Sequence, residues 1–184
     1  MQSISLDAAE AMTGISRRTL WRRVADGELT STGKDARNRA VLALEGLQGW
    51  MQGHTGLVFS AQDLHRLCQA DAGDAQAQVD LGAWLYTSPR AVPRVENSQP
   101  ASQPASQPAS QPASQPASQP ALYWLHLAAE QNHGDAMHWL ATVAANTGTQ
   151  QGHYESLMWL AKAAMQGHPI ATAQLPALLD AVLT

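Results

Sequence analysis

Apolar positions in the C-terminal two thirds of the chain recur with the spacing of an α-helix. The spacing is clearest in three sets: Trp124, Leu127 and Ala128; Met137, Leu140, Ala141 and Ala144; and Leu157, Leu160, Ala161 and Ala164. Residues three and four apart share one face of a helix. The pattern predicts helices at 61–70, 75–87, 121–131, 135–146, 155–166 and 170–182. Pro176 is expected to kink or restart the last of them.

These predicted helices belong to a repeated unit. Three positions recur in it, held by Gly73, Asn132 and Gly167, by Ala77, Ala136 and Ala171, and by Leu81, Leu140 and Leu175. Asn132 and Gly167 are 35 residues apart, whereas Gly73 and Asn132 are 59 apart, which is 24 more. A period near 35 residues is typical of an α-solenoid built from helix–turn–helix units.

The 24 extra residues match a low-complexity stretch, 98–121, in which Ser-Gln-Pro-Ala is repeated six times. A proline at every fourth position prevents a continuous helix or sheet ladder. The stretch also lacks the apolar content that would offset the entropy of ordering it. We predict a disordered loop at 94–120, inserted within one repeat, with its flanking helices packed against each other. A proline-rich ligand for a recognition domain is the alternative interpretation.

Residues 4–26 predict two short helices joined by a tight turn. Ser5 and Ser16 are the expected N-caps, Gly14 and Gly27 the ends, and the inward positions are Leu6, Ala9, Met12, Leu20 and Val24. The polar residues 30–35 predict a turn. A short strand is expected at 37–44 and a third helix at 44–51.

Positive charge is concentrated in the second of these helices. Arg17, Arg18, Arg22 and Arg23 are four of the eleven Lys and Arg residues of the chain. The net charge is −4, yet residues 1–54 carry +1 and residues 55–184 carry −5. A short cationic helix fits the major groove of DNA, where guanidinium groups match phosphate and guanine. A solvated helix face is the alternative interpretation.

The segment Leu6-Asp7-Ala8-Ala9-Glu10-Ala11-Met12-Thr13-Gly14-Ile15-Ser16-Arg17-Arg18-Thr19-Leu20-Trp21-Arg22-Arg23, followed by Gly27-Glu28-Leu29, resembles the winged helix-turn-helix of MerR and excisionase-type proteins. The resemblance implies a DNA-binding domain at 1–54. It also implies that duplex DNA is contacted by the second helix and by a wing, here the loosely basic residues 33–39. The residues matched to these roles are Arg17, Arg18, Thr19, Trp21, Arg22, Lys34, Arg37 and Arg39.

Two further segments are similar to the inter-repeat signature of Sel-one-like repeats, which are relatives of tetratricopeptide repeats. They are Ala161-Lys162-Ala163-Ala164-Met165-Gln166-Gly167-His168 and Ala128-Ala129-Glu130-Gln131-Asn132-His133. The resemblance implies, at 55–184, an α-solenoid that scaffolds protein complexes and has no chemistry of its own. Tryptophan is common at binding hot spots. The partner-binding candidates are therefore Trp84, Trp124, Trp139 and Trp159, with a place in the core as their alternative role.

Other functional classes find little support in the sequence. Cys68 is the only cysteine, so no intramolecular disulfide can form. No pair of histidines has the spacing His-x-x-x-His, and there is no Gly-rich phosphate loop or Gly-x-Ser-x-Gly motif. We therefore expect no metal, no cofactor, no catalytic residue and no small-molecule substrate. The lack of a leader and of a long apolar run predicts a cytoplasmic protein without a membrane partner.

The combined prediction is a mainly α protein, in which a small winged helix-turn-helix precedes a short α-solenoid that carries the Ser-Gln-Pro-Ala insertion. It is predicted to act as a DNA-binding transcriptional regulator through the helix at 16–26. The C-terminal repeats are predicted to bind a protein partner or a second copy of the chain. The alternative is a non-catalytic protein–protein adaptor whose helix-turn-helix does not bind DNA.

Overall fold

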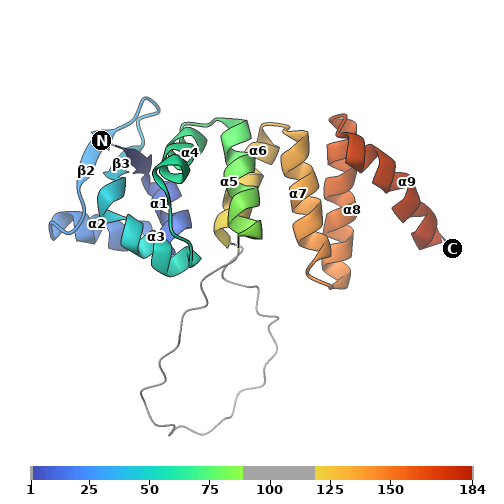
Figure 1. The fold of residues 1–184 in the computed structure, drawn as a ribbon, viewed down its shortest axis with the longest axis horizontal. Coiled ribbons are helices and arrows are strands. Elements are labelled where there is room, and N and C mark those ends of the chain that lie inside the picture. Colours follow the sequence, from blue (N-terminus) through green and yellow to red (C-terminus); the bar gives the residue numbers. More distant parts are fainter. Residues whose placement is uncertain (1, 89–118, 184) are drawn as a thin grey trace, which may run out of the picture.

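The computed structural model describes residues 2–88 and 119–183, with side chains described as far as residue 177. Within these ranges the protein is mainly helical, and its helices stand side by side in a row (Figure 1). The helices are α1 (Leu6–Thr13), α2 (Arg17–Ala25), η1 (Leu44–Gly46, a 3₁₀ turn), α3 (Gln48–Thr55), α4 (Ala61–Asp71), α5 (Ala75–Thr87), α6 (Gln119–Glu130), α7 (Gly134–Ala145), α8 (Gln150–Met165) and α9 (Pro169–Leu183). The strands are β1 (Ser3–Ser5), β2 (Ser31–Lys34) and β3 (Ala40–Ala43).

The first two helices begin and end as predicted. The side chain of Ser5 accepts the N–H of Ala8 at the start of α1, and Ser16 accepts the N–H of Thr19 at the start of α2. Gly14 ends α1 in the left-handed conformation, with φ 67°, which glycine adopts without a Cβ clash. The expected inward residues of α1 are all buried. Local capping chemistry therefore fixes the angle at which α2 leaves α1.

The segment after α2 differs from the prediction. Residues 31–34, expected as a turn, form strand β2, which pairs antiparallel with β3; β1 pairs with the other edge of β3. The turn lies instead at 35–39, where the carboxylate of Asp35 accepts the backbone N–H groups of Arg37 and Arg39. β2 is an exposed edge strand with an irregular register, so it lacks the alternation of apolar and polar residues that marks a half-buried strand.

Two further boundaries were placed wrongly in the N-terminal third. The three residues of β1 were not predicted as a strand, because so short a segment shows no period. The third helix, expected at 44–51, is a 3₁₀ turn at Leu44–Gly46 followed by α3 at Gln48–Thr55. α3 ends at Gly56, which has a φ of 70°. The helix exists, but it begins and ends about one turn later than the apolar residues indicate.

The six helices predicted in the C-terminal part of the chain are found as α4 to α9, with small changes at their ends. Gly73, Asn132 and Gly167, the three equivalent residues, all adopt positive φ values, of 99°, 61° and 78°. Asparagine is the residue that best replaces glycine in this conformation. The interhelix turns of the repeat therefore share one backbone geometry, which the sequence pattern had indicated.

Two helix ends in this region need correction. α8 begins at Gln150, five residues before the predicted start, because Thr149 caps it by accepting the N–H of Gly152. α9 continues through Pro176 rather than restarting there. A proline removes one backbone hydrogen bond from a helix but does not by itself end it.

Most of the predicted loop at 94–120 lies outside the described residues. Its last residues do not: α6 begins at Gln119, so Gln119, Pro120 and Ala121 of the final tetrapeptide are helical. Proline is accepted in the first turn of a helix, because its missing N–H would have no partner there. α5 and α6 pack against each other, as predicted for an insertion. Gly82 of α5 lies so close that a Cβ would stand 2.7 Å from Cγ of Leu125 in α6.

One hydrophobic cluster runs from the N-terminal sheet into α6. It contains Ile4, Met12 and Leu20 together with Leu67 of α4 and Trp124 of α6. The indole N–H of Trp124 points to the sulfur of Met12, with an N–S distance of 3.2 Å. The predicted boundary between residues 54 and 55 stays a prediction, but the interior is continuous across it.

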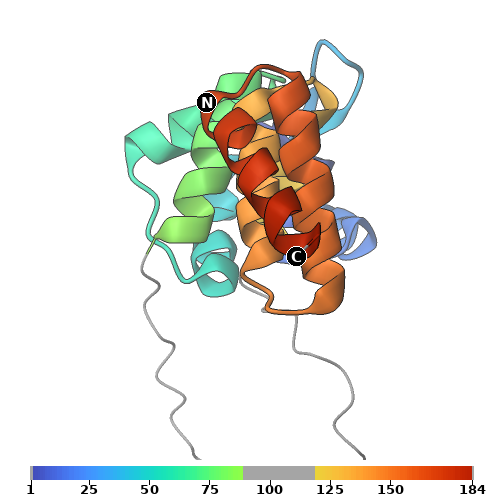
Figure 2. The ribbon, with the colours of Figure 1, turned by 90° about the vertical axis from the view of Figure 1, so that its right-hand side faces the viewer.

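A second cluster fills the space between α6, α7, α8 and α9. Figure 2, which views the molecule from the α9 end, shows these helices packed around it. His168 lies at the start of α9 and is almost fully buried. Its Nδ1 accepts the N–H of Ala171 at 3.2 Å, and its Nε2 lies 3.2 Å from a carboxylate oxygen of Asp135. Its ring stacks on that of His138 with 4.5 Å between centroids.

The hydrogen bond by which His168 caps the start of α9 predicts that folding depends on pH. Burial lowers the pKa of His168, the neighbouring His138 lowers it further, and Asp135 opposes both. Because the folded-state pKa lies below the unfolded value of about 6.5, the unfolded chain binds more protons as the pH falls. The stability that the neutral His168 contributes is therefore fully present above a pH of about 6.5. It is lost as the pH falls through the lower pKa of the folded state. Thermal unfolding at a series of pH values between about 5 and 8 measures the effect.

Asparagine is the test substitution, since it also caps helices but does not titrate. His168→Asn is expected to flatten the dependence of the melting temperature on pH. His65→Asn, at an exposed position of α4, is the matched control and keeps the wild-type profile. An unchanged profile in His168→Asn would show that the cap histidine is not the titrating group.

Candidate nucleic-acid interface

Helix α2 lies at one end of the molecule (Figure 1) and contains Arg17, Arg18, Arg22 and Arg23. Leu20 is fully buried and anchors the helix, and Val24 packs beside the same core. Arg18 and Arg22, one helical turn apart, are exposed and have no ion pair or hydrogen bond with any described residue. Trp21 lies next to them with 45% of its surface exposed. These side chains are free to meet a ligand without first breaking an internal contact.

Arg17 and Thr19 are less free than predicted. The guanidinium of Arg17 bridges back to α1, 2.8 Å from Asp7 and 3.1 Å from Glu10. Exposed ion pairs of this kind contribute little stability, so a phosphate can compete for the arginine. Thr19 is half-buried and its hydroxyl lies 3.1 Å from that of Ser16. Thr19 therefore belongs to the capping turn more than to the exposed face.

Arg23 lies over Trp50 of α3, with its guanidinium carbon 4.3 Å from the ring centroid, and it pairs with Glu28. A cation above an aromatic ring is attracted by the ring quadrupole. Arg23 thus joins α2 to α3, which leaves Arg18 and Arg22 as the unpaired cations of the helix.

The hairpin does not extend the cationic face of α2. In both ribbon views the turn between β2 and β3 and helix α2 lie at opposite edges of the N-terminal unit (Figures 1 and 2). Lys34 is exposed and donates to Asn38 at 2.9 Å. The guanidinium of Arg37 lies over Gly73, where a Cβ would meet it. The structure therefore separates Lys34 and Arg37 from the α2 arginines, although the sequence grouped them.

Arg39, predicted to contact DNA, is engaged inside the protein, and we correct that prediction. Its Nε donates to Asp35 at 2.7 Å, and its two terminal nitrogens donate to Asp71, one to the carboxylate at 2.9 Å and one to the carbonyl oxygen at 2.8 Å. Burial would raise the pKa of Asp35, but the N–H groups and charge of Arg39 hold it below its usual value. The arginine therefore joins the turn between β2 and β3 to the end of α4.

Asp71 is the centre of this network and was not predicted. Its buried carboxylate accepts both the backbone N–H and the hydroxyl of Ser5, each at 2.6 Å, in addition to the arginine bond. A buried charge is tolerated when it is paired and hydrogen-bonded in this way. Ser5 and Asp71 are 66 residues apart, and no local pattern in the sequence links them.

The four candidate tryptophans do not converge on one surface. Trp124 is fully buried, so it is corrected from a partner-binding residue to a core residue. The other three are half-buried on α5, α7 and α8, and each meets a different ring: Trp84 meets Phe59, Trp139 meets Tyr86, and Trp159 meets His126. Trp84, Trp139 and Trp159 therefore each pack against a neighbouring ring, and part of each side chain stays exposed.

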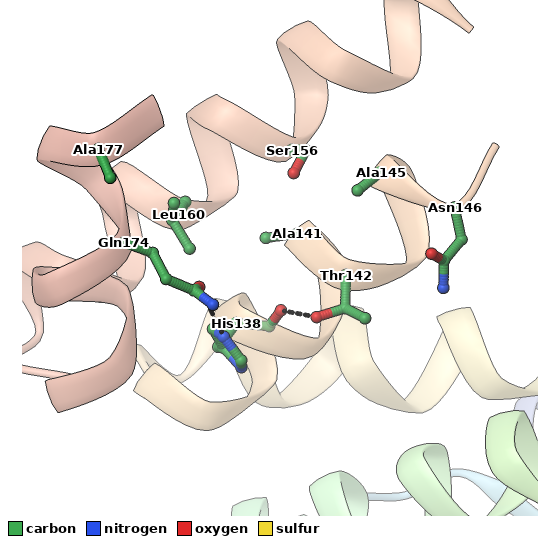
Figure 3. Close-up of a pocket in the computed structure, with 9 residues that line it drawn as sticks. All are labelled: His138, Ala141, Thr142, Ala145, Asn146, Ser156, Leu160, Gln174 and Ala177. Atoms are coloured by element: carbon green, nitrogen blue, oxygen red, sulfur yellow. Dashed lines mark hydrogen bonds between the residues drawn. The ribbon is translucent and has the colours of Figure 1, made fainter. Parts of the chain in front are cut away.

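A hollow of about 400 Å³ lies between α7, α8 and α9 (Figure 3). None of the predicted site residues lines it. His138 reaches across it to Gln174, with 3.3 Å between ring nitrogen and amide oxygen. Small residues on α7 widen the hollow, and the lining is His138, Ala141, Thr142, Ala145, Asn146, Ser156, Leu160, Gln174 and Ala177. The lining contains one histidine and no carboxylate.

No three histidine, cysteine, aspartate or glutamate side chains within residues 2–88 and 119–177 gather as ligands for a metal ion. In the same part of the chain, no helix has both the length and the apolar character that a bilayer crossing requires. Comparison of the chain with protein-family models, with curated proteins and with solved structures finds no match.

Proposed function

We propose that the protein is a DNA-binding regulator that places α2 in the major groove of duplex DNA. The observation that carries the proposal is the pair Arg18 and Arg22, unpaired and exposed on a helix whose opposite side is anchored by the buried Leu20. Guanidinium groups on such a helix suit both phosphates and guanine edges. The proposal places the protein in the cytoplasm, where such a regulator meets DNA.

In this proposal the N-terminal unit is a winged helix-turn-helix and the helices α4 to α9 are a short α-solenoid. The capped turn at Ser16 supports the first assignment, and the repeated left-handed turns support the second. The wing contributes less than the family resemblance implies, because Arg39 is clamped and Arg37 faces Gly73. Specificity then depends on α2, and a motif this small requires a second copy or a partner protein.

The test is a salt-titrated mobility shift with Arg18→Ala/Arg22→Ala. Each lost phosphate contact lowers the slope of log K against log salt by about 0.9, so the double variant is expected to lose nearly two units of slope. Its affinity for mixed-sequence duplex DNA is expected to fall about tenfold or more at low salt. Both arginines are exposed, so circular dichroism melting should stay close to the wild-type curve.

Arg66→Ala is the control for the loss of an arginine outside α2. Arg66 carries the same charge on α4 and pairs only with Asp63, within its own helix. It is expected to bind DNA as the wild type does. If wild type and the α2 double variant bind equally, the α2 proposal is wrong, whatever the strength of binding.

A non-catalytic adaptor is the second candidate, and a specific observation favours it. The hairpin turn points away from α2, and Arg17 is already paired with Asp7 and Glu10. The helix therefore offers two free cations rather than the broad basic surface of many DNA-binding domains. Selection from a pool of genomic fragments separates the candidates, since an adaptor enriches no sequence at any salt concentration.

A further inference from the structure

The outer face of α8 carries a stripe of exposed apolar side chains. Tyr154 is 59% exposed, Met158 43% and Met165 84%. Ala161 completes a series at i, i+4, i+7 and i+11, which is one face of a helix. We call these four residues the α8 stripe. The buried residues of the helix, Gly152, Leu160 and Ala163, lie on the opposite side.

The stripe is the main concentration of exposed apolar surface in the described part of the chain. Three of the six large apolar side chains found exposed there belong to it. The other three, Trp21, Val58 and Ile170, lie on different segments. Figures 1 and 2 place α8 beside α9 at the end of the molecule remote from α2. A contiguous apolar stripe of this kind marks a surface for protein association.

The α8 stripe is complementary to itself when two copies of the helix lie antiparallel. A two-fold axis passing between residues 159 and 160 sets Tyr154 against Met165 of the second copy, and Met158 against Ala161. Each bulky residue then meets a smaller or more flexible one, as packed helix pairs require. An isologous contact of this type closes into a dimer.

The charges beside the stripe obey the same symmetry. Glu155 and Lys162 are seven residues apart, so they occupy one edge of the stripe. Antiparallel pairing brings Glu155 of each copy next to Lys162 of the other, which forms two ion pairs. Parallel pairing instead places the Glu155–Lys162 edge of one copy against the opposite edge of the other, so these two ion pairs do not form. The charge pattern therefore selects the antiparallel arrangement.

Both charges are available for such a contact. Lys162 lies 4.3 Å from the ring centroid of Trp159, which keeps it at the edge of the stripe. Glu155 accepts a hydrogen bond from Gln151, one turn earlier, at 2.8 Å. Neither makes an ion pair with any residue in the described ranges. Their pairing across a dimer would break no internal salt bridge.

We propose that the α8 stripe is a homodimer interface in which two α8 helices pack antiparallel. Its biological use rests on the proposed function, because a second α2 supplies the second DNA contact. α8 has 16 residues, so the helix pair is about 24 Å long. That contact is smaller than the roughly 800 Å² per partner of a standard interface. A weak dimer is expected, with a dissociation constant of about 1–100 μM.

Sedimentation velocity of the full chain without DNA tests the interface directly. The wild type is expected to shift from the 19.7 kDa monomer to twice that mass as its concentration rises through about 1–200 μM. Met158→Glu buries a charge at the centre of the stripe and is expected to stay monomeric throughout. Val58→Glu, at an exposed apolar residue outside α8, is the control and dimerises as the wild type does.

Charge reversal tests the antiparallel register. Glu155→Lys or Lys162→Glu alone sets like charges against each other and is expected to weaken the dimer about tenfold. The double change Glu155→Lys/Lys162→Glu restores opposite charges across the two-fold axis and should recover dimerisation. An equimolar mixture of the two single variants should form the heterodimer in preference to either homodimer.

A wild type that remains monomeric, or a Met158→Glu variant that still dimerises, would overturn the interface. A double charge reversal that fails to recover would overturn the antiparallel register. Mobility shifts measure DNA binding independently of dimerisation, so the two proposals can fail separately. Loss of DNA binding in Arg18→Ala/Arg22→Ala with intact dimerisation supports both. A dimer that binds no duplex DNA refutes only the proposed function.

Discussion

Replacing Asp71 with alanine is expected to lower the free energy of unfolding by about 2–4 kcal/mol. The change removes one of the two carboxylates that pair with the partly buried guanidinium of Arg39, which keeps its bond to Asp35. It also leaves the N–H of Ser5 without the carboxylate oxygen that accepts it at 2.6 Å. The loss of a charged hydrogen bond and a buried donor without an acceptor both count against the folded state. Urea unfolding followed by circular dichroism gives the difference.

Asp80→Ala is the control for this prediction. Asp80 is an exposed acid of α5 whose one side-chain bond is to Gln76. Its removal is expected to change stability by no more than about 0.5 kcal/mol. Asp71→Asn should fall between the two, because the amide keeps an acceptor for Ser5 but loses the charge that Arg39 needs. If Asp71→Ala and Asp80→Ala were equally stable, the network would not support the fold.

Replacing Trp124 with alanine is expected to cost a similar amount, about 3–5 kcal/mol. The indole is fully buried where α6 meets α1, and its N–H points to the sulfur of Met12. Truncation leaves a cavity at the contact between the N-terminal unit and the later helices, and neighbouring side chains fill it only in part. The free energy of unfolding in guanidinium chloride gives the magnitude.

Hydrogen exchange shows where that destabilisation acts. Backbone amides of α1 are expected to exchange faster in Trp124→Ala, although residue 124 is 112 positions away from Met12. Trp124→Phe keeps most of the volume and should lose about 1–2 kcal/mol. Trp84→Ala, at a half-buried site of α5, controls for the loss of an indole as such. Unaltered exchange in α1 would mean that the two parts of the chain unfold separately.

The features that the sequence predicted well are local ones. Ser5 and Ser16 cap helices, and Gly73, Asn132 and Gly167 adopt positive φ, because these preferences depend on a few neighbouring residues. The packing of α5 on α6 also followed from the spacing of the repeat. The Ser-Gln-Pro-Ala insertion was predictable because it lengthens one spacing of the repeat by its own 24 residues and leaves the other spacing unchanged.

What the sequence missed depends on contacts between distant residues. β2 is polar and lies at an edge, so its identity as a strand comes from pairing with β3 rather than from its own pattern. In the sequence Arg39 resembles the other basic residues of the predicted wing. Only the fold shows that it pairs with Asp71, which is 32 positions later. The same holds for Trp124, because four tryptophans of similar sequence context differ in burial only after the helices have packed.

The sequence predicted the exposed arginines of α2, but it did not predict where the hairpin lies relative to them. The amphipathic spacing of Leu20 against Arg18 and Arg22 is local, so the exposed face of α2 could be inferred from the sequence. The separation of the hairpin turn from α2 is a matter of how the sheet is oriented. No periodicity in residues 28–43 records that orientation.

The shared interior between Ile4 and Trp124 has a consequence for how such a chain can arise. Two units that merely adjoin can be exchanged by gene fusion, because each has a complete interior of its own. Here the side chains of α1 to α6 share one interior. Transfer of residues 2–56 to another protein is therefore expected to require α4, α5 and α6 as well.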